Sequence, residues 1–351
     1  MTSPFIITEC DERSSLSGQV VNVRKKINFL NKEESDNDST YLPSVVASSS
    51  SITSDSDIET NIVRQKTRCL KNMLYLISKI PLMYVGIPED CYFIIKQISK
   101  QTKIPIEHIL LCLKKIRLNS TFSELEDNFS ISLSYGSKLF LKNIPKIANV
   151  LRSFIVKLNK QSTLNTLPIA FRQNYYNVSC ILDCLEIDIK KPSKALHQAL
   201  TWSDYKKENT VKYLVSCTPN GLINFVSSGF GGRASDIIVL ENCKFLETLE
   251  PGTVVLADRG LKHVEQMLAE EGIKLLRPPS VTTGSKLSKD VVRQTKVRAS
   301  LRIHVERVIR RIREFHMLKQ HAVVNAKILR DLDHCIVIAC GLINLQDSLI
   351  K

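Results

Sequence analysis

The sequence predicts an α/β protein in which a mixed β-sheet is flanked by helices, preceded by an all-α region and a disordered N-terminal tail. Three observations predict this order. Residues 1–64 are acidic and serine-rich, and residues 65–165 repeat apolar residues at helical spacing. From residue 176 onward, segments with strand spacing alternate with helical segments, which indicates a sheet domain over residues 176–346.

The tail and the body of the chain differ in charge. The 351 residues carry a net charge of +14, yet residues 1–60 hold ten acids and only five bases. A strongly basic body indicates a polyanionic partner, most often nucleic acid. The stretch 47–60, "ASSSSITSDSDIET", has almost no large apolar side chain, which predicts a solvated tail. Phosphorylation of its serines is the alternative role.

Cysteine spacing and hydropathy restrict the setting of the protein. None of the ten cysteines forms a C-x-x-C pair, so we expect no structural zinc site and a reducing compartment. The N-terminus shows only a short apolar run, which does not indicate a secretory signal. The longest apolar run, residues 335–345, is too short to cross a bilayer and predicts a buried helix. We therefore expect an intracellular protein without membrane contact.

Residues 106–158 show the pattern of a helix-turn-helix. Apolar residues recur at helical spacing over 106–116, and Thr121 and Glu124 fit a capping box in which Glu124 reaches back. A short helix is expected from the Thr121 cap to about Phe129. A turn near residue 131 then leads into the second helix of the helix-turn-helix, which Pro145 is expected to end before another helix begins. The outward face of the second helix would present Ser134, Tyr135, Lys138 and Lys142 to DNA. An ordinary helical bundle is the alternative.

The sheet region is predicted element by element. The sequence "TPNG" between two apolar runs indicates a hairpin turn, and Gly272 is a suitable end for a helix. The predicted strands are 180–189, 211–217, 222–228, 253–258 and 273–279, and the predicted helices are 263–272, 299–315 and 335–345. Such an order predicts a mixed sheet covered by helices.

The helix at 299–315, "ASLRIHVERVIRRIREF", combines an apolar stripe with a basic ridge. At about 100° per residue, one stripe that can pack on the sheet contains Leu301, Val305, Val308, Ile309 and Ile312. Arg302, Arg310 and Arg313 fall within about 40° of Glu306 on the helical wheel. The simple explanation of Glu306 is a pair of salt bridges to Arg302 and Arg310, each four residues away.

Two other acids suggest a different role for Glu306. Asp183 follows an apolar run in the first predicted strand, and Asp258 ends the fourth. A carboxylate at such a place is partly desolvated, yet the sheet holds it firmly, so it suits a ligand better than a structural residue. Three carboxylates that converge would repel one another unless cations lay between them. Oxygen ligands of this kind suit Mg²⁺ or Mn²⁺.

Residues 176–346 resemble the DDE superfamily endonuclease domain of Harbinger-type transposases and their insertion-sequence relatives. The matching stretches, in the order of that family, are "ILDCLEI", "LTWSDYKKENTVKYLV", "TPNG", "GFGGRASDI", "VVLADRG", "RASLRIHVERVIRRIREF" and "IACGLINL". Residues 106–158 also resemble the helix-turn-helix that precedes this domain in such transposases.

The resemblance implies an RNase H-like fold and a metal-binding triad of Asp183, Asp258 and Glu306 that is also catalytic. Two divalent ions bridged by Asp183 would drive phosphoryl transfer on duplex DNA without a protein nucleophile. The family also implies a nuclear, homo-oligomeric enzyme that needs no small-molecule cofactor. Asp236 matches a recurrent acid of the family, although capping of the next helix is its simpler role.

Basic residues near the triad are candidates for phosphate contacts: Lys206, Lys207, Arg259, Arg302, Arg310 and Arg313. Trp202 and Tyr205 either stack on an extruded base or pack on the sheet. His304 lies about 160° from Glu306 on the wheel, so we assign it no catalytic role.

Two alternatives to an active transposase remain. One is a domesticated transposase, kept as a DNA-binding protein without cleavage activity, for which the acidic tail is an argument. The other is a metal-dependent nuclease unrelated to transposition.

Overall fold

The computed structural model describes residues 6–8, 24–26, 55–157, 160–172, 175–258, 261, 264–277 and 289–348. Most of the predicted tail lies outside these residues. Within it, β1 (Ile6–Thr8) pairs with β2 (Arg24–Lys26) in an antiparallel manner. Helix α1 (Asp55–Lys79) begins inside the segment predicted to be a disordered tail, before the predicted boundary at residue 64.

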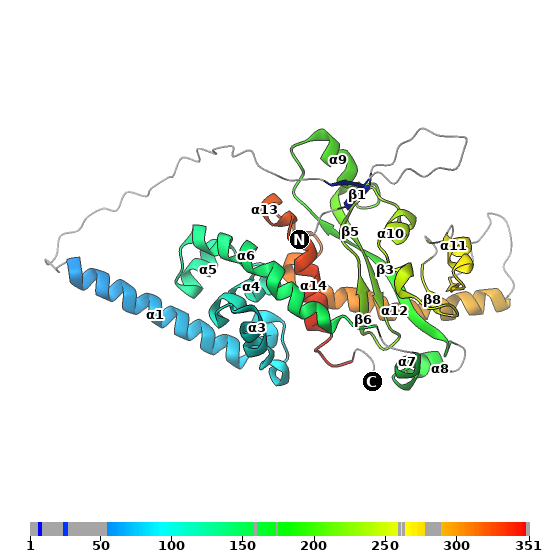
Figure 1. Ribbon diagram of the computed structural model, residues 1–351, viewed down its shortest axis with the longest axis horizontal. Helices are drawn as coiled ribbons and strands as arrows, with labels where there is room; N and C mark the ends of the chain where they lie inside the picture. The colour runs from blue at the N-terminus through cyan, green and yellow to red at the C-terminus, as the bar shows by residue number, and fades with distance from the viewer. Residues whose placement is uncertain are drawn as a thin grey trace.

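An all-α region follows α1 and matches the predicted helical segment. Its elements are α2 (Pro81–Val85), η1 (Glu89–Cys91), α3 (Ile94–Thr102), α4 (Ile106–Leu118), α5 (Phe122–Phe129), α6 (Leu133–Leu151) and η2 (Arg152–Phe154). Figure 1 shows α1 projecting to one side of this region. The helices expected for a helix-turn-helix are therefore present, whereas their use in binding DNA stays a prediction.

The capping box at the start of α5 is only half formed. The Thr121 side chain accepts a hydrogen bond from the Glu124 backbone N–H at 3.1 Å, as predicted. The Glu124 carboxylate does not reach back; it pairs with the Lys114 ammonium at 2.6 Å and accepts a hydrogen bond from Ser120 at 2.8 Å. Lys114 is only 2% exposed, so its charge requires this nearby carboxylate.

Helix α6 continues through Pro145, which corrects the predicted break there. Proline removes one backbone donor, and this loss opposes a continuous helix. The residues that follow, Ile147, Ala148 and Leu151, are all buried in the main hydrophobic core. Burial of that face outweighs the lost hydrogen bond because each buried apolar side chain contributes about 1.5–3 kcal/mol.

A curled, mixed sheet forms the second half of the molecule. Its strands are β3 (Val178–Asp188), β4 (Trp202–Ser203), β5 (Glu208–Cys217), β6 (Ile223–Val226), β7 (Phe230–Gly231), β8 (Val254–Leu256) and β9 (Lys274–Leu276). The main order is β4-β5-β3-β8-β9, with β6 and β7 also paired to β5. β3 is antiparallel to β5 but parallel to β8, and β8 is parallel to β9. The predicted hairpin is confirmed, since β5 and β6 pair across "TPNG".

Helices cover both faces of this sheet. Alternate residues of β3 enter two cores, with Ile181 and Leu185 on one face and Cys180 and Leu182 on the other. The first face packs against α12 (Lys289–Ile312) and α14 (Leu332–Ile343), and the second against α10 (Asp236–Asn242) and α11 (Glu265–Glu270). The remaining helices are α7 (Lys160–Asn165), α8 (Ile169–Arg172), α9 (Ala195–Thr201), η3 (Leu246–Thr248), η5 (His316–Leu318) and α13 (Ala326–Leu329).

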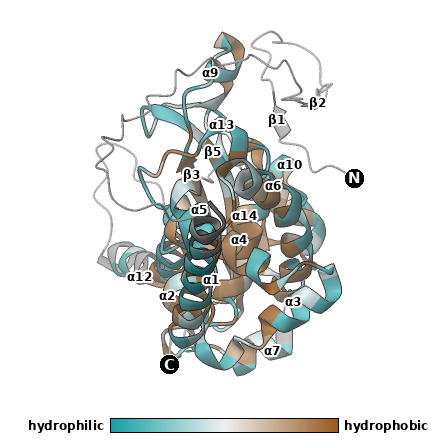
Figure 2. Cartoon of the chain, turned by 90° about the vertical axis from the view of Figure 1, so that its left-hand side faces the viewer, coloured by the Kyte–Doolittle hydropathy of each residue, from teal (hydrophilic) through white to brown (hydrophobic). Residues whose placement is uncertain are grey.

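The predicted apolar stripe of α12 is confirmed, because Leu301, Val305, Val308, Ile309 and Ile312 are all buried. The same core continues through α14 into α4 and α6 of the all-α region. Figure 2 shows this concentration of hydrophobic residues on α14 and α4 and the hydrophilic character of α1. In the described part of the chain, no helix is both long and apolar enough to cross a membrane.

Candidate acidic active site

The strand register brings two of the predicted acids side by side. β3 and β8 run parallel, with Ile181 opposite Leu256. Asp183 and Asp258 each lie two residues beyond this pair, so they leave the paired region at the same edge of the sheet. β8 ends at Leu256 while β3 continues to Asp188, which leaves the edge of β3 open beyond β8.

A cavity of about 600 Å³ lies at this place, and all three predicted acids line it. Asp183 comes from β3, Asp258 follows β8, and Glu306 comes from α12. The buried stripe of α12 fixes the rotation of that helix, and this rotation turns Glu306 toward the sheet edge. The other residues of the cavity wall are Cys184, Glu186, Tyr205, Lys206, Lys212, Asp236, Arg302, Ile309 and Arg313.

Arg302 links two of the acids. One guanidinium nitrogen lies 3.1 Å from an Asp258 oxygen, and the other lies 3.9 Å from an Asp183 oxygen. Glu306 forms no ion pair with any described lysine or arginine, so the predicted salt bridges to Arg302 and Arg310 are wrong. Arg302 turns toward the strand acids because two carboxylates attract its charge more strongly than one. A cation between Asp183 and Asp258 is therefore the arrangement that these residues favour.

Asp183 is poorly solvated for a carboxylate. Burial raises its pKa to about 6, and the neighbouring Asp258 and Asp236 act in the same direction. The Arg302 charge and a 2.8 Å hydrogen bond from the Cys184 backbone N–H oppose this rise only in part. Such a carboxylate gains from any further cation in the cavity.

Lys212 also lines the cavity, and sequence reasoning missed it. Its ammonium lies 3.1 Å from Asp236 and 3.5 Å from Glu186, and it donates to the Ala234 carbonyl at 2.9 Å. Thr210 donates a hydrogen bond to Glu186 at 2.9 Å. Burial tends to lower the pKa of Lys212, but the two carboxylates outweigh burial and raise it. A lysine inside the apolar run "VKYLV" was the available signal.

Asp236 does not cap α10, which corrects the simpler of its two predicted roles. Ser235 is the N-cap residue, and its hydroxyl accepts a hydrogen bond from the Ile238 backbone N–H. Asp236 is the first helical residue and points its carboxylate at Lys212 instead. Attraction to a largely buried ammonium is stronger than a hydrogen bond to an exposed backbone N–H.

The predicted phosphate contacts divide into three groups. Arg302, Arg313 and Lys206 line the cavity, whereas Lys207 and Arg310 are exposed outside its wall. Arg259 lies outside the described residues.

Lys138 and Lys142 are remote from the acids and line a separate groove on α6. That groove also contains His108, Tyr135 and the lysines Lys103 and Lys146.

The aromatic residues near the cavity are more exposed than a packing role requires. Tyr205 is 84% exposed at the cavity wall, and the Lys206 ammonium lies 5.2 Å from its ring centroid. Trp202 is 40% exposed and donates a hydrogen bond to Asp204. Packing on the sheet therefore does not account for Tyr205. His304, by contrast, is buried edge-on against Phe171, as expected of a residue outside the site.

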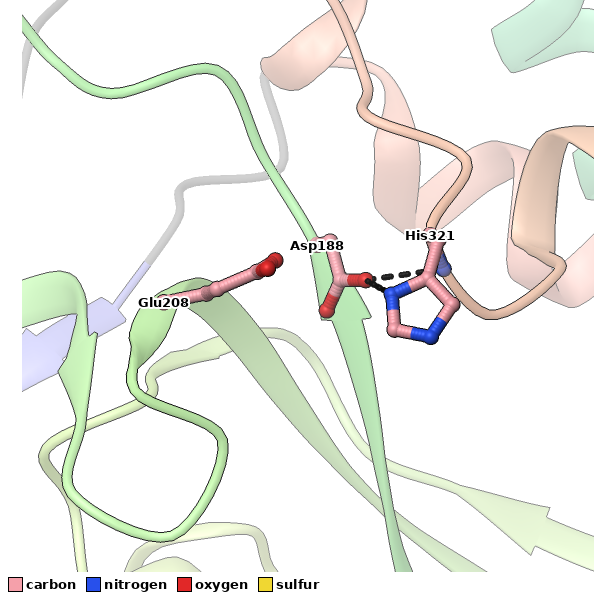
Figure 3. A group of neighbouring side chains, drawn as sticks. All are labelled: Asp188, Glu208 and His321. Atoms are coloured by element: carbon pink, nitrogen blue, oxygen red, sulfur yellow. Dashed lines mark hydrogen bonds and ion pairs between the residues drawn. The ribbon is translucent and has the colours of Figure 1, made fainter.

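Metal-ligating residues also gather at a second place. Among the described residues, one group of three acids or histidines has ligand atoms within 4.8 Å of one another: Asp188, Glu208 and His321. Figure 3 shows this group at the end of β3. The nine cysteines of the described part are free and form no such group.

Comparison with known proteins agrees with the DDE endonuclease part of the resemblance found in the sequence motifs. No curated protein and no solved structure matches the chain. A family model does match, and the matched segment begins one residue before Asp183 and ends just after α14. Residues 182–344, which contain all three predicted acids, match the family described as DDE superfamily endonuclease.

Proposed function

We propose that this chain is a metal-dependent DNA endonuclease of the Harbinger transposase type, with Asp183, Asp258 and Glu306 as its catalytic triad. The observation that carries the proposal is the convergence of these three acids on one cavity inside the family-matched segment. The sheet order supports an RNase H-like fold, since β3, the first strand of this sheet, lies between an antiparallel β5 and a parallel β8.

The donor chemistry of the cavity fits Mg²⁺ or Mn²⁺, and the three acids would draw closer on binding, because their ligand atoms do not all lie within 4.8 Å of one another. Their donors are carboxylate oxygens, which both ions prefer, and the guanidinium of Arg302 already lies between two of them. Asp183, Asp258 and Glu306 would hold the metal. When bound, two such ions activate a water or a DNA 3′-hydroxyl for in-line attack on phosphorus.

The remaining residues of the cavity have roles that their own chemistry defines. Arg313 and Lys206 offer positive charge at the wall to the phosphates that flank the cleaved bond. Tyr205 presents an exposed aromatic ring on which an unpaired base can stack. Lys212 holds Glu186 and Asp236 in place and offsets part of the negative charge that these two acids bring to the site.

The groove on α6 supports duplex DNA as the substrate. Lys138, Lys142 and Lys146 are spaced four residues apart and therefore form one basic stripe along the helix. Lys103 faces the same groove from the loop before α4. Contacts of this type bind the phosphate backbone and give affinity that decreases with salt.

A cleavage assay tests the proposal. The purified chain with Mg²⁺ or Mn²⁺ should nick duplex DNA, and Asp258→Asn should reduce the rate by at least about two orders of magnitude. Asp347→Asn is the matched control, because Asp347 is an exposed aspartate that does not line the cavity, and this variant should retain full activity. Equal rates for the two variants would remove the metal triad.

A second candidate function is a domesticated transposase that binds DNA without cutting it. The pairing of Arg302 with Asp258 and Asp183 favours it, since the guanidinium neutralises these acids without any metal. This candidate predicts DNA binding that is unaffected by Asp258→Asn, together with no metal-dependent cleavage by the unmodified chain.

A further inference from the structure

We propose a second metal site, formed by Asp188, Glu208 and His321, that binds Zn²⁺ or a similar transition-metal ion. It is separate from the acidic cavity, whose wall contains none of these residues. Figure 3 shows the three side chains converging from two strands and one loop.

The spacing of the donors suits a small divalent ion. One ligand atom of each residue lies within 4.8 Å of the other two. In a tetrahedral site with ligands at about 2.0–2.2 Å from the ion, the donor atoms lie about 3.3–3.6 Å apart. The donors must therefore approach one another by up to roughly an ångström. The side chains of His321 and Glu208 are exposed and can make this movement.

The chemistry of the donors points to zinc rather than magnesium or calcium. One imidazole nitrogen accompanies two carboxylate oxygens. Imidazole suits Zn²⁺, whereas Mg²⁺ and Ca²⁺ favour all-oxygen sites. Three protein ligands leave a fourth tetrahedral position for water or another ligand.

The fold holds this group in place. Asp188 ends β3 and lies opposite Thr210 in the antiparallel pair, so Glu208 is its diagonal neighbour on the adjacent strand. The loop that carries His321 is fixed to the same strand end. Its Val324 exchanges backbone hydrogen bonds with Asp188 and Lys190, both at 3.0 Å. The His321 backbone N–H also donates to the Asp188 carboxylate at 2.9 Å.

The charges of the group distinguish it from the other acid clusters. Asp183 and Asp258 share Arg302, and Glu186 and Asp236 share Lys212.

Asp188 and Glu208, by contrast, form no ion pair with a lysine or arginine of the described residues. Asp188 is only 5% exposed, so its carboxylate is a partly desolvated charge beside a second carboxylate. The Nδ1 atom of His321 lies 3.7 Å from the nearer Asp188 oxygen, which is too far for a good hydrogen bond. A cation between these groups would compensate both acids.

Spectroscopy with Co²⁺ and calorimetry with Zn²⁺ test the site directly. The whole, untagged chain should be used with Cys69→Ser, because that thiol is exposed and could bind Zn²⁺ itself. We expect Zn²⁺ binding that His321→Ala and Glu208→Gln each weaken at least about tenfold, as for other groups that support a metal. Co²⁺ should give visible absorption bands of a tetrahedral site, and His321→Ala should remove them. His316→Ala, an exposed histidine of η5, is the matched control.

Asp258→Asn separates this site from the acidic cavity. The variant should keep the Zn²⁺ affinity and the Co²⁺ bands even though the proposed nuclease activity is lost. Loss of both signals in Asp258→Asn, or their survival in His321→Ala, would overturn the second site. Glu208→Gln and Asp258→Asn conserve the shape of the side chain, and His321→Ala replaces an exposed one. The buried Asp188 therefore need not be altered.

Discussion

Replacement of Arg302 by methionine tests whether this guanidinium stands where a metal binds. The change keeps much of the length of the side chain but removes its charge. Asp183 and Asp258 then face each other and Glu306 without the positive charge of Arg302. We expect a lower free energy of unfolding without metal, and a larger gain on adding Mn²⁺ than the unmodified chain shows.

The magnitude follows from two distances. At an effective dielectric constant of about 20, unit charges 3.1 Å and 3.9 Å apart attract by about 5 and about 4 kcal/mol before solvation is considered. The Asp258 side chain is 51% exposed, so solvent screens the shorter pair strongly. Asp183 is 24% exposed and Arg302 16%, so their pair retains more. After desolvation is offset, we expect a net loss of roughly 1–3 kcal/mol.

Urea unfolding followed by circular dichroism measures both effects, with and without millimolar Mn²⁺. Metal that binds only the folded state stabilises it by an amount that grows with the ratio of its concentration to Kd. In Arg302→Met no guanidinium must be displaced first, so this gain should be larger. Arg310→Met is the control, because Arg310 is exposed on the same helix outside the cavity. Equal stabilities, or equal gains from Mn²⁺, in the two variants would refute the reasoning.

Three further predictions concern stability and DNA binding. Burial raises the pKa of Asp333 to about 6 even though Tyr213 donates a 2.8 Å hydrogen bond to it. Ionisation of Asp333 therefore opposes folding above about pH 6 and not below about pH 4. At pH 8, the free energy of unfolding of Asp333→Asn should exceed that of the parent by up to about 3 kcal/mol, with a higher urea midpoint. Near pH 4 the two proteins should have the same midpoint. Equal midpoints at pH 8 would contradict this. Gly341→Ala would place a Cβ 2.5 Å from the Leu151 carbonyl oxygen and should lower the free energy of unfolding by roughly 1–3 kcal/mol in the same assay. Lys142→Ala should weaken DNA binding and reduce the salt slope by about one, as measured by fluorescence anisotropy; an unchanged slope would place the groove outside the DNA path.

Local patterns predicted most of the elements that shape the site. The alternation of β3, the "TPNG" hairpin and the stripe of α12 are each set by residues close in sequence, and all are found. The positions of Asp183 and Asp258 at the ends of apolar runs indicated that these acids can converge with Glu306. The parallel pairing of β3 and β8 that brings them to one cavity is visible only in the structure.

Long-range pairing set what the sequence could not predict. Glu306 has two arginines at salt-bridge spacing, yet Arg302 prefers Asp258 and Asp183, which come from other elements. Lys212 reads locally as a strand residue, and only the fold brings Glu186 and Asp236 to it. Pro145 is a helix breaker by local rules, and the tertiary core overrides it.

Helix α14 has a consequence for how the protein would handle a bound duplex. It is buried along its length between the sheet and the helices α4 and α6, so the basic groove and the acidic cavity belong to one solid body. Within the described residues, one continuous buried core joins the surface that would bind DNA to the cavity that would cut it. The distance between the bound site and the cleavage site on the DNA, counted in base pairs, would then be constant.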